Sequence, residues 1–226
     1  EMLTRALFTP ANLHYAIIQG GRHDVDACER YLYHALQNFF GNQEGAQVNL
    51  EPVTRGTLAR DVMDNPAFAG YGRLLFPVDR TIPDNMTLED VGDLLIWYHY
   101  VNPDKTVEIV NSLGERAAAG DAVFCDICTD EEKAADPDKE DTGLFFFRGD
   151  PGGKTAICSA GGGFMYVGAM QDSFPHALEL SKQGYNAFAL IYRPGAQTAC
   201  EDLARAIAFL HEHAEELDID MGYYSL

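Results

Sequence analysis

The chain has 226 residues, which allows one or two domains, and 46% of them are hydrophobic, which is enough for a globular core. Its 35 acidic residues and 16 Lys and Arg give a net charge of −19, which disfavours a nucleic-acid partner, because such a partner requires clustered Lys and Arg. No run of about 20 apolar residues exists, so the sequence predicts no membrane-spanning helix.

The first predicted unit is a strand, a glycine turn and a helix. The apolar run at 13–19 favours a strand, and the turn Gly20–Asp24 follows it. Residues 25–40 repeat apolar side chains at helical spacing, and the Asp that precedes them suits an N-cap. His23 is therefore expected between a strand and a helix N-terminus, where a histidine can act as a general base. The alternative is a solvated surface histidine.

Two further segments precede the main predicted sheet. Residues 42–65 are polar and weakly patterned, and we interpret them as a linker. Residues 66–120 are predicted to form a helical extension. A helix is expected over 87–101, with Thr87 and Asp90 at the spacing of a capping box.

The second helix of this extension is expected to start at Asn102 and Pro103, which suit the N-cap and the first helical position, and to end before Gly120. The residues Trp97–Tyr100 form an aromatic cluster. We expect the cluster to pack the extension against the sheet; the alternative is that it lines a substrate pocket.

Residues 121–226 predict an α/β domain. Apolar runs indicate strands at 122–128, 143–148, 154–159, 187–192 and 223–226, and amphipathic segments indicate helices at 174–182 and 199–217. The first three strands follow each other without a helix, which favours an antiparallel start to the sheet. The later strands alternate with helices, which is typical of parallel strands joined by crossover helices.

An acidic segment interrupts the first strands. Eight carboxylates lie between Asp126 and Asp141, but their spacing fits no EF-hand, so we predict a solvated loop. Cys125 and Cys128 form a CxxC pair, but residues three apart in a strand point to opposite faces, and no second ligand pair completes a metal site. We expect no metal, and free thiols in a reducing, cytoplasmic location.

The candidate functional motif is the triple glycine Gly161–Gly163, directly after the predicted strand 154–159. Glycines let a backbone approach a substrate closely, so the amide groups of this turn could bind a developing oxyanion. The alternatives are a turn without a ligand and an NADP-binding oxidoreductase. In a dinucleotide site, Tyr166 would occupy the third glycine position, and Arg193 follows the next strand where an acidic residue is expected.

Three segments carry a family resemblance. SAGGGF at Ser159–Phe164, IYRPG at Ile191–Gly195 and the helix-like residues 200–220 resemble hormone-sensitive-lipase-type carboxylesterases of the α/β-hydrolase fold. The resemblance implies that residues 121–226 are the N-terminal half of such a domain, with oxyanion donors at Gly162, Gly163 and Phe164. It further implies a small ester substrate, an acyl-serine intermediate and no cofactor. The His that often opens the glycine turn is replaced here.

Residues 1–41 resemble the C-terminal strand, turn and helix of an esterase-type hydrolase, in which His23 would be the triad histidine of an upstream domain. No serine of the chain lies in G-x-S-x-G, so the nucleophile and the acid would lie outside it. Both ends of the chain therefore look cut. We expect the parent protein to be a carboxylesterase and this chain alone to be inactive; the alternative is a non-catalytic binding protein of the same fold.

Overall fold

The protein is described by a computed structural model that covers residues 51–98 and 101–226, and every structural statement below concerns these residues. The predicted strand, turn and helix over 1–41, with His23, lie outside the described residues. The same holds for His99 and Tyr100 of the aromatic cluster.

A five-stranded mixed sheet organises the structure, with strand order β1-β2-β4-β3-β5. The strands are β1 (Phe124–Cys125), β2 (Gly143–Phe147), β3 (Lys154–Ser159), β4 (Asn186–Ile191) and β5 (Asp220–Ser225). β2 runs antiparallel to both β1 and β4, whereas β3 runs parallel to β4 and β5. The predicted fold class, an α/β partial hydrolase sheet with an antiparallel start and then parallel strands, is confirmed.

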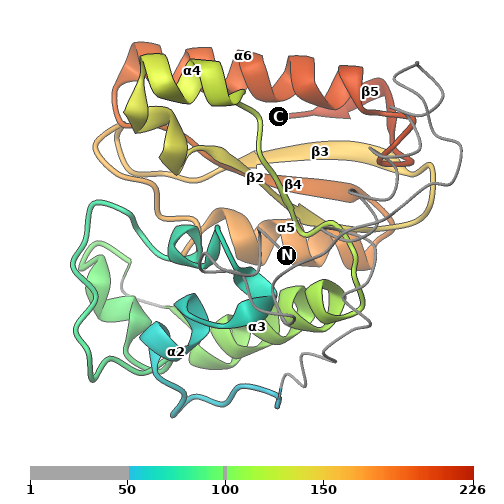
Figure 1. Cartoon of the computed structure of the whole chain (residues 1–226). Coiled ribbons are helices and arrows are strands. Elements are labelled where there is room, and N and C mark those ends of the chain that lie inside the picture. Colours follow the sequence, from blue (N-terminus) through green and yellow to red (C-terminus); the bar gives the residue numbers. More distant parts are fainter. Residues whose placement is uncertain (1–50, 99–100) are drawn as a thin grey trace, which may run out of the picture. The chain divides into compact units, whose positions relative to one another are not determined.

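Two crossover helices cover the parallel part of the sheet. α5 (Ser173–Lys182) joins β3 to β4, and α6 (Ala196–Glu212) joins β4 to β5. The two helices lie on opposite faces of the sheet, with α6 above it and α5 below it in Figure 1. Every residue of β2 and β4 is buried, because both faces of these strands are covered. This burial explains why both strands read as unbroken apolar runs.

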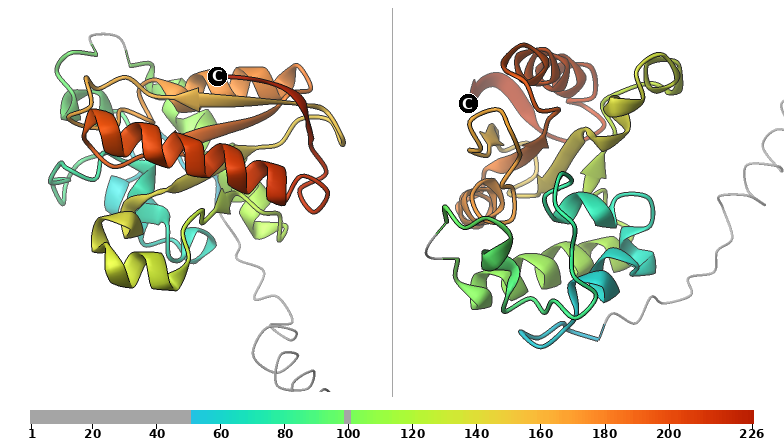
Figure 2. Two further views of the ribbon diagram at one scale, coloured as in Figure 1. Left: turned by 90° about the horizontal axis from the view of Figure 1, so that it is seen from above. Right: turned by 90° about the vertical axis from the view of Figure 1, so that its left-hand side faces the viewer.

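The helical extension packs beyond α5, on the side of the sheet opposite α6 (Figures 1 and 2). Its elements are α2 (Ala59–Met63), three short 3₁₀ helices, η2 (Pro66–Phe68), η3 (Gly72–Leu75) and η4 (Val91–Leu94), and α3 (Pro103–Ala118). α3 begins as predicted, since the Asn102 side chain accepts a hydrogen bond of 3.0 Å from the Asp104 amide. Ile109 and Leu113 of α3 are fully buried in the core.

The helix predicted over 87–101 is wrong, because the described part of this segment contains only the 3₁₀ helix η4 before α3. The expected contact between Thr87 and Asp90 is present, with 2.6 Å between Thr87 Oγ1 and Asp90 Oδ2. Thr87 also forms an antiparallel bridge with Leu58, which holds the start of the segment extended. Gly92 weakens the helix interior, and Leu95 leaves it with extended dihedral angles. The bridge between Leu58 and Thr87 therefore outweighs the local capping signal.

The expected linker and acidic loop both contain regular structure. Within the described part of the linker, 51–65, α2 buries Ala59 and Val62 in the core and so packs with the extension. The acidic segment contains α4 (Asp130–Ala135), with a capping box, and the 3₁₀ helix η5 (Pro137–Asp141). Neither has a buried residue, in agreement with its predicted solvation. The division of the chain into four segments otherwise stays a prediction.

Candidate functional site

The glycine turn 161–164 directly follows β3, at the carboxyl end of that parallel strand. In α/β sheets, ligands bind at this edge, outside the carboxyl ends of the strands. Gly161, Gly163 and Phe164 are exposed to solvent, and 49% of the Phe164 residue surface is accessible. The turn therefore presents its backbone to solvent where an α/β protein usually binds its substrate.

The backbone of the turn has a conformation that few sequences adopt. Gly163 and Phe164 both have φ of 60°, and the second of these is unusual for a residue with a side chain. A Cβ atom at Gly162 would lie 1.9 Å from the carbonyl oxygen of Tyr166, so only glycine fits there. A strained non-glycine residue in an exposed turn is typical of functional sites.

Three hydrogen bonds fix the two ends of the turn. The buried Tyr192 hydroxyl donates to the Ala160 carbonyl at 2.7 Å. The Gly161 amide donates to Asp172 Oδ2, also at 2.7 Å. At the other end, the Gly195 amide donates to the Phe164 carbonyl at 2.7 Å. The turn is thus tied to the ends of β3 and β4 and to the residue that precedes α5.

Between these anchors, three successive amides are free. The N–H groups of Gly162, Gly163 and Phe164 donate to no other residue in the described part of the chain. These are the three residues that the family resemblance implies as oxyanion donors. Backbone amides that are fixed and unpaired can bind an anionic oxygen without rearrangement. Their role in an oxyanion hole stays a prediction.

Two side chains beside the turn, Tyr98 and Cys158, have raised pKa values and remain protonated at neutral pH. Burial, together with the nearby Asp172 carboxylate, raises the pKa of Tyr98 to about 12. The Tyr98 hydroxyl donates to Asp172 Oδ2 over 3.4 Å. Burial also raises the pKa of the Cys158 thiol, near the end of β3, to about 11, so this cysteine is a poor nucleophile.

The described residues supply unpaired amides, but they show no serine paired with a histidine. Among residues 51–98 and 101–226, no serine hydroxyl hydrogen-bonds to a histidine. Ser181 donates to the Leu178 carbonyl instead, and the buried Ser173 hydroxyl has no partner. The predicted triad histidine, His23, lies outside the described residues.

Arg193, which follows β4, has a structural role. Its guanidinium contacts Asp202 at 2.7 Å and Asp136 at 2.5 Å, which uses its charge within the fold. The helix expected over 199–217 starts earlier, at Ala196, so Asp202 lies buried in the second turn of α6. A pocket of about 380 Å³ beside Arg193 is lined by acidic side chains, which disfavours the phosphate of an NADP cofactor.

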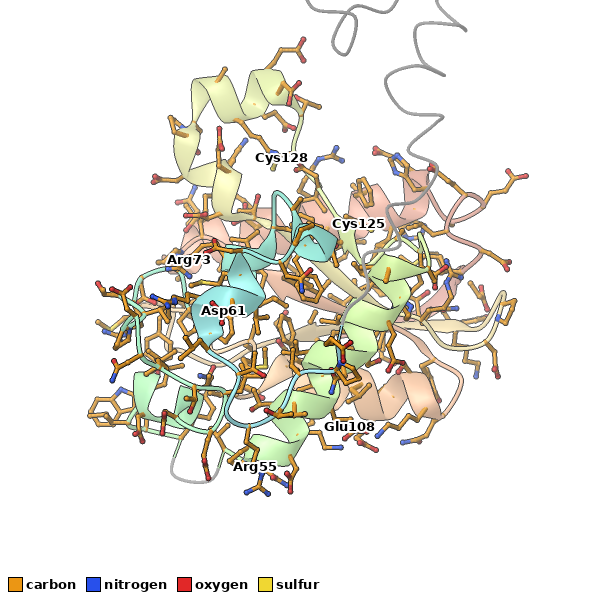
Figure 3. The ribbon with its side chains drawn as sticks, turned by 60° about the horizontal axis from the view of Figure 1, so that its bottom comes forward. Arg55, Asp61, Arg73, Glu108, Cys125 and Cys128 are labelled. Atoms are coloured by element: carbon orange, nitrogen blue, oxygen red, sulfur yellow. The ribbon has the colours of Figure 1, made fainter. Side chains whose placement is uncertain are left out.

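The cysteine pair gives no sign of a metal site. Cys125 and Cys128 are both buried free thiols, labelled in Figure 3, and burial raises the pKa of Cys125 to about 12. No group of three or more His, Cys, Asp or Glu side chains in the described ranges is placed to hold a metal ion.

No helix in the described part of the chain has the length and apolar character needed to cross a membrane.

Comparisons with known proteins give one partial likeness. No family model matches the chain, and no curated protein matches it. A thermophilic esterase, Est2, from the Planctomycetes species Thermogutta terrifontis is similar in structure, with 22% sequence identity and a TM-score of 0.33. The similar region covers 37% of this chain and 34% of the esterase, so it spans about a third of either protein.

Proposed function

We propose that this chain belongs to a serine carboxylesterase of the α/β-hydrolase type, in which the turn after β3 forms the oxyanion hole. The observation that carries the proposal is the set of three free, fixed amides at Gly162, Gly163 and Phe164. They lie at the edge of the sheet where α/β proteins bind ligands, and they need no side chain to act.

The proposed reaction is acyl transfer through a covalent intermediate. A serine hydroxyl attacks the ester carbonyl carbon while a histidine takes its proton, and negative charge develops on the carbonyl oxygen. The free amides donate to this oxygen, and each such donor typically contributes about 3 kcal/mol of transition-state stabilisation. Collapse of the intermediate expels the alcohol, which receives the proton, and water then releases the carboxylic acid. His23 is proposed as the triad histidine of a separate upstream domain, so it is not the histidine of this step.

The test uses the natural polypeptide that contains these 226 residues. We expect it to hydrolyse a p-nitrophenyl ester of a short acid and to lose that activity after reaction with a fluorophosphonate, which labels an activated serine. Mass spectrometry should place the label on a serine in a G-x-S-x-G sequence.

The matched control is the isolated 226-residue chain, for which we expect neither turnover nor labelling, because none of its serines has that sequence context. A natural polypeptide that folds but shows no turnover and no labelling would overturn the proposal. That outcome would favour the second candidate, a non-catalytic binding protein, since no described serine contacts a histidine.

A further inference from the structure

The extension reaches the candidate site through Tyr98. This residue lies between η4 and α3, and its hydroxyl lies 3.1 Å from the position of a Cβ atom at either Gly161 or Gly168. Both positions are glycine, so the tyrosine ring fits closely over the start of the turn. The Tyr98 hydroxyl also hydrogen-bonds to Asp172, a residue 74 positions away in sequence.

Asp172 joins Tyr98 to the turn. One of its oxygens, Oδ2, accepts both the Gly161 amide at 2.7 Å and the Tyr98 hydroxyl at 3.4 Å. The other oxygen, Oδ1, lies 3.3 Å from Nδ1 of the exposed His176. Hydrogen bonds to a charged carboxylate are stronger than those between neutral groups, so this side chain is a firm anchor for the amide.

We infer that Asp172 and Tyr98 are positioning residues, which hold Gly161 so that the next three amides keep their donor orientation. The inference rests on the proposed function, in which those amides bind the oxyanion. Because Gly161 directly precedes the donors, rotation of its peptide group would turn the first free amide. The extension then contributes to the site by orienting the turn, in addition to packing on the sheet.

Amide hydrogen exchange of the 226-residue chain, labelled with ¹⁵N-glycine, tests the positioning without any need for turnover. We expect slow exchange at Gly161 and fast exchange at Gly162 and Gly163. In the Asp172→Ala variant, exchange at Gly161 should accelerate about tenfold or more, and Asp172→Asn, which keeps an acceptor, should restore part of the protection. Unchanged exchange at Gly161 in Asp172→Ala would overturn the inference.

The Tyr98→Phe variant removes only the hydroxyl, and we expect about a twofold to fivefold faster exchange at Gly161. Its matched control is Tyr71→Phe, because the Tyr71 hydroxyl donates to the Ala67 carbonyl elsewhere in the extension. Tyr71→Phe should leave Gly161 unchanged. Equal effects of the two tyrosine variants would show that Tyr98 acts only through general packing, and the inference would fail for that residue.

Kinetics of the natural polypeptide separate this inference from the proposed function. If the polypeptide turns over esters, Asp172→Ala should lower kcat about 10- to 100-fold with a much smaller change in KM, because donor orientation matters most in the transition state. An active enzyme whose kcat is insensitive to Asp172→Ala would overturn the positioning role. Absence of turnover in the unmodified polypeptide would reject the proposed function, and the exchange measurements would still decide whether Asp172 and Tyr98 hold the turn.

Discussion

Two turns follow the neighbouring parallel strands β3 and β4 at the same edge of the sheet. The polar groups of one turn are paired within the protein, and those of the other are not. After β4, the Arg193 guanidinium is bound by Asp202 and Asp136, and the Arg193 amide also donates to Asp202 Oδ2 at 2.7 Å. After β3, three successive amides of the glycine turn have no partner among the described residues. We call the turn after β4 the closed turn, because its polar groups are paired with other elements. We call the turn after β3 the open turn, because its amides are unpaired.

The difference separates structural from functional polar groups. A buried charge must be paired, so the cluster at Arg193 ties α6 and the acidic segment to β4 and has little left to offer a ligand. Free amides contribute nothing to folding, and a strained residue such as Phe164 costs free energy. A turn that is fixed at both ends and has unpaired amides in its middle is the arrangement that the proposed oxyanion site requires.

The largest expected effect follows from breaking the closed turn. The side chains of Arg193 and Asp202 are only 9% and 3% exposed, so Asp202→Ala would leave a buried cation without its main partner. We expect the free energy of unfolding to fall by about 3 kcal/mol, measured by urea denaturation.

Glu201→Ala is the matched control for that variant. Glu201 lies 3.8 Å from the same guanidinium, but its side chain is 54% exposed. Its removal should therefore cost less than about 1 kcal/mol. Similar losses in the two variants would contradict the view that burial makes the Arg193–Asp202 pair structural.

The open turn should respond to added volume at one glycine far more than at the next. A Cβ at Gly162 would lie 1.9 Å from the Tyr166 carbonyl oxygen, whereas one at Gly163 has no atom within 4 Å. We expect Gly162→Ala to displace the turn and to lower the free energy of unfolding by about 2 kcal/mol. Gly163→Ala should cost about 1 kcal/mol, from its left-handed φ alone.

The same pair of variants tests the function of the turn. In the natural polypeptide, Gly162→Ala should lower kcat by about 100-fold because its donors move, and Gly163→Ala should keep much more of the activity. If both variants lose activity equally, the clash with Tyr166 is not the cause, because only a side chain at position 162 would make it.

The sequence predicted those parts of the structure whose causes are local. The apolar runs of β2 and β4 stand out because these strands are buried, and the triple glycine stands out because a side chain at Gly162 would clash with the backbone. The anchors of the turn could not be found in this way. Asp172 and Tyr98 lie in unrelated segments, and only the packing of the extension brings them together.

Local signals also misled where tertiary contacts prevailed. The pair Thr87 and Asp90 predicted a helix start, and its contact did form, yet the bridge from Leu58 to Thr87 and Gly92 limited the segment to a short 3₁₀ helix. The helix expected over 199–217 starts three residues earlier, at Ala196, and Asp202 lies buried in its second turn, where it pairs with Arg193.

The smallest expected effect on stability concerns a group of charged side chains that join the extension to α5. Unlike the Arg193–Asp202 pair, these side chains are not buried. Lys105 contacts Glu108 at 2.5 Å and Glu179 at 2.7 Å, and Lys182 contacts the same two carboxylates at 2.5 and 2.8 Å. Figure 3 shows Glu108 on α3. Each charge has two opposite neighbours, so the four side chains form a closed network.

This network should add stability only above the pH at which its carboxylates titrate. Hydrogen bonds from Lys105 and then Lys182 lower the pKa of Glu179 from its ordinary value of 4.5 to about 2. A carboxylate whose pKa is lower in the folded state stabilises the fold above its unfolded value, and this contribution disappears as the pH falls from 4.5 to about 2. The unmodified chain should therefore exceed Glu179→Gln in Tm at pH 6, and the difference should vanish near pH 2.

Salt gives an independent check, because these side chains are solvated and the Debye length falls to about 3 Å at 1 M ionic strength. At about 1 M NaCl, the Tm difference between the unmodified chain and Glu179→Gln should therefore be smaller than in dilute buffer. Glu131→Gln is the control, since Glu131 is exposed on α4 and has no ion-pair partner among the described residues. A Tm difference for Glu179→Gln that persists at pH 2 and in high salt would mean that the side chain acts through packing, and the contrast with the buried pair at Arg193 would fail.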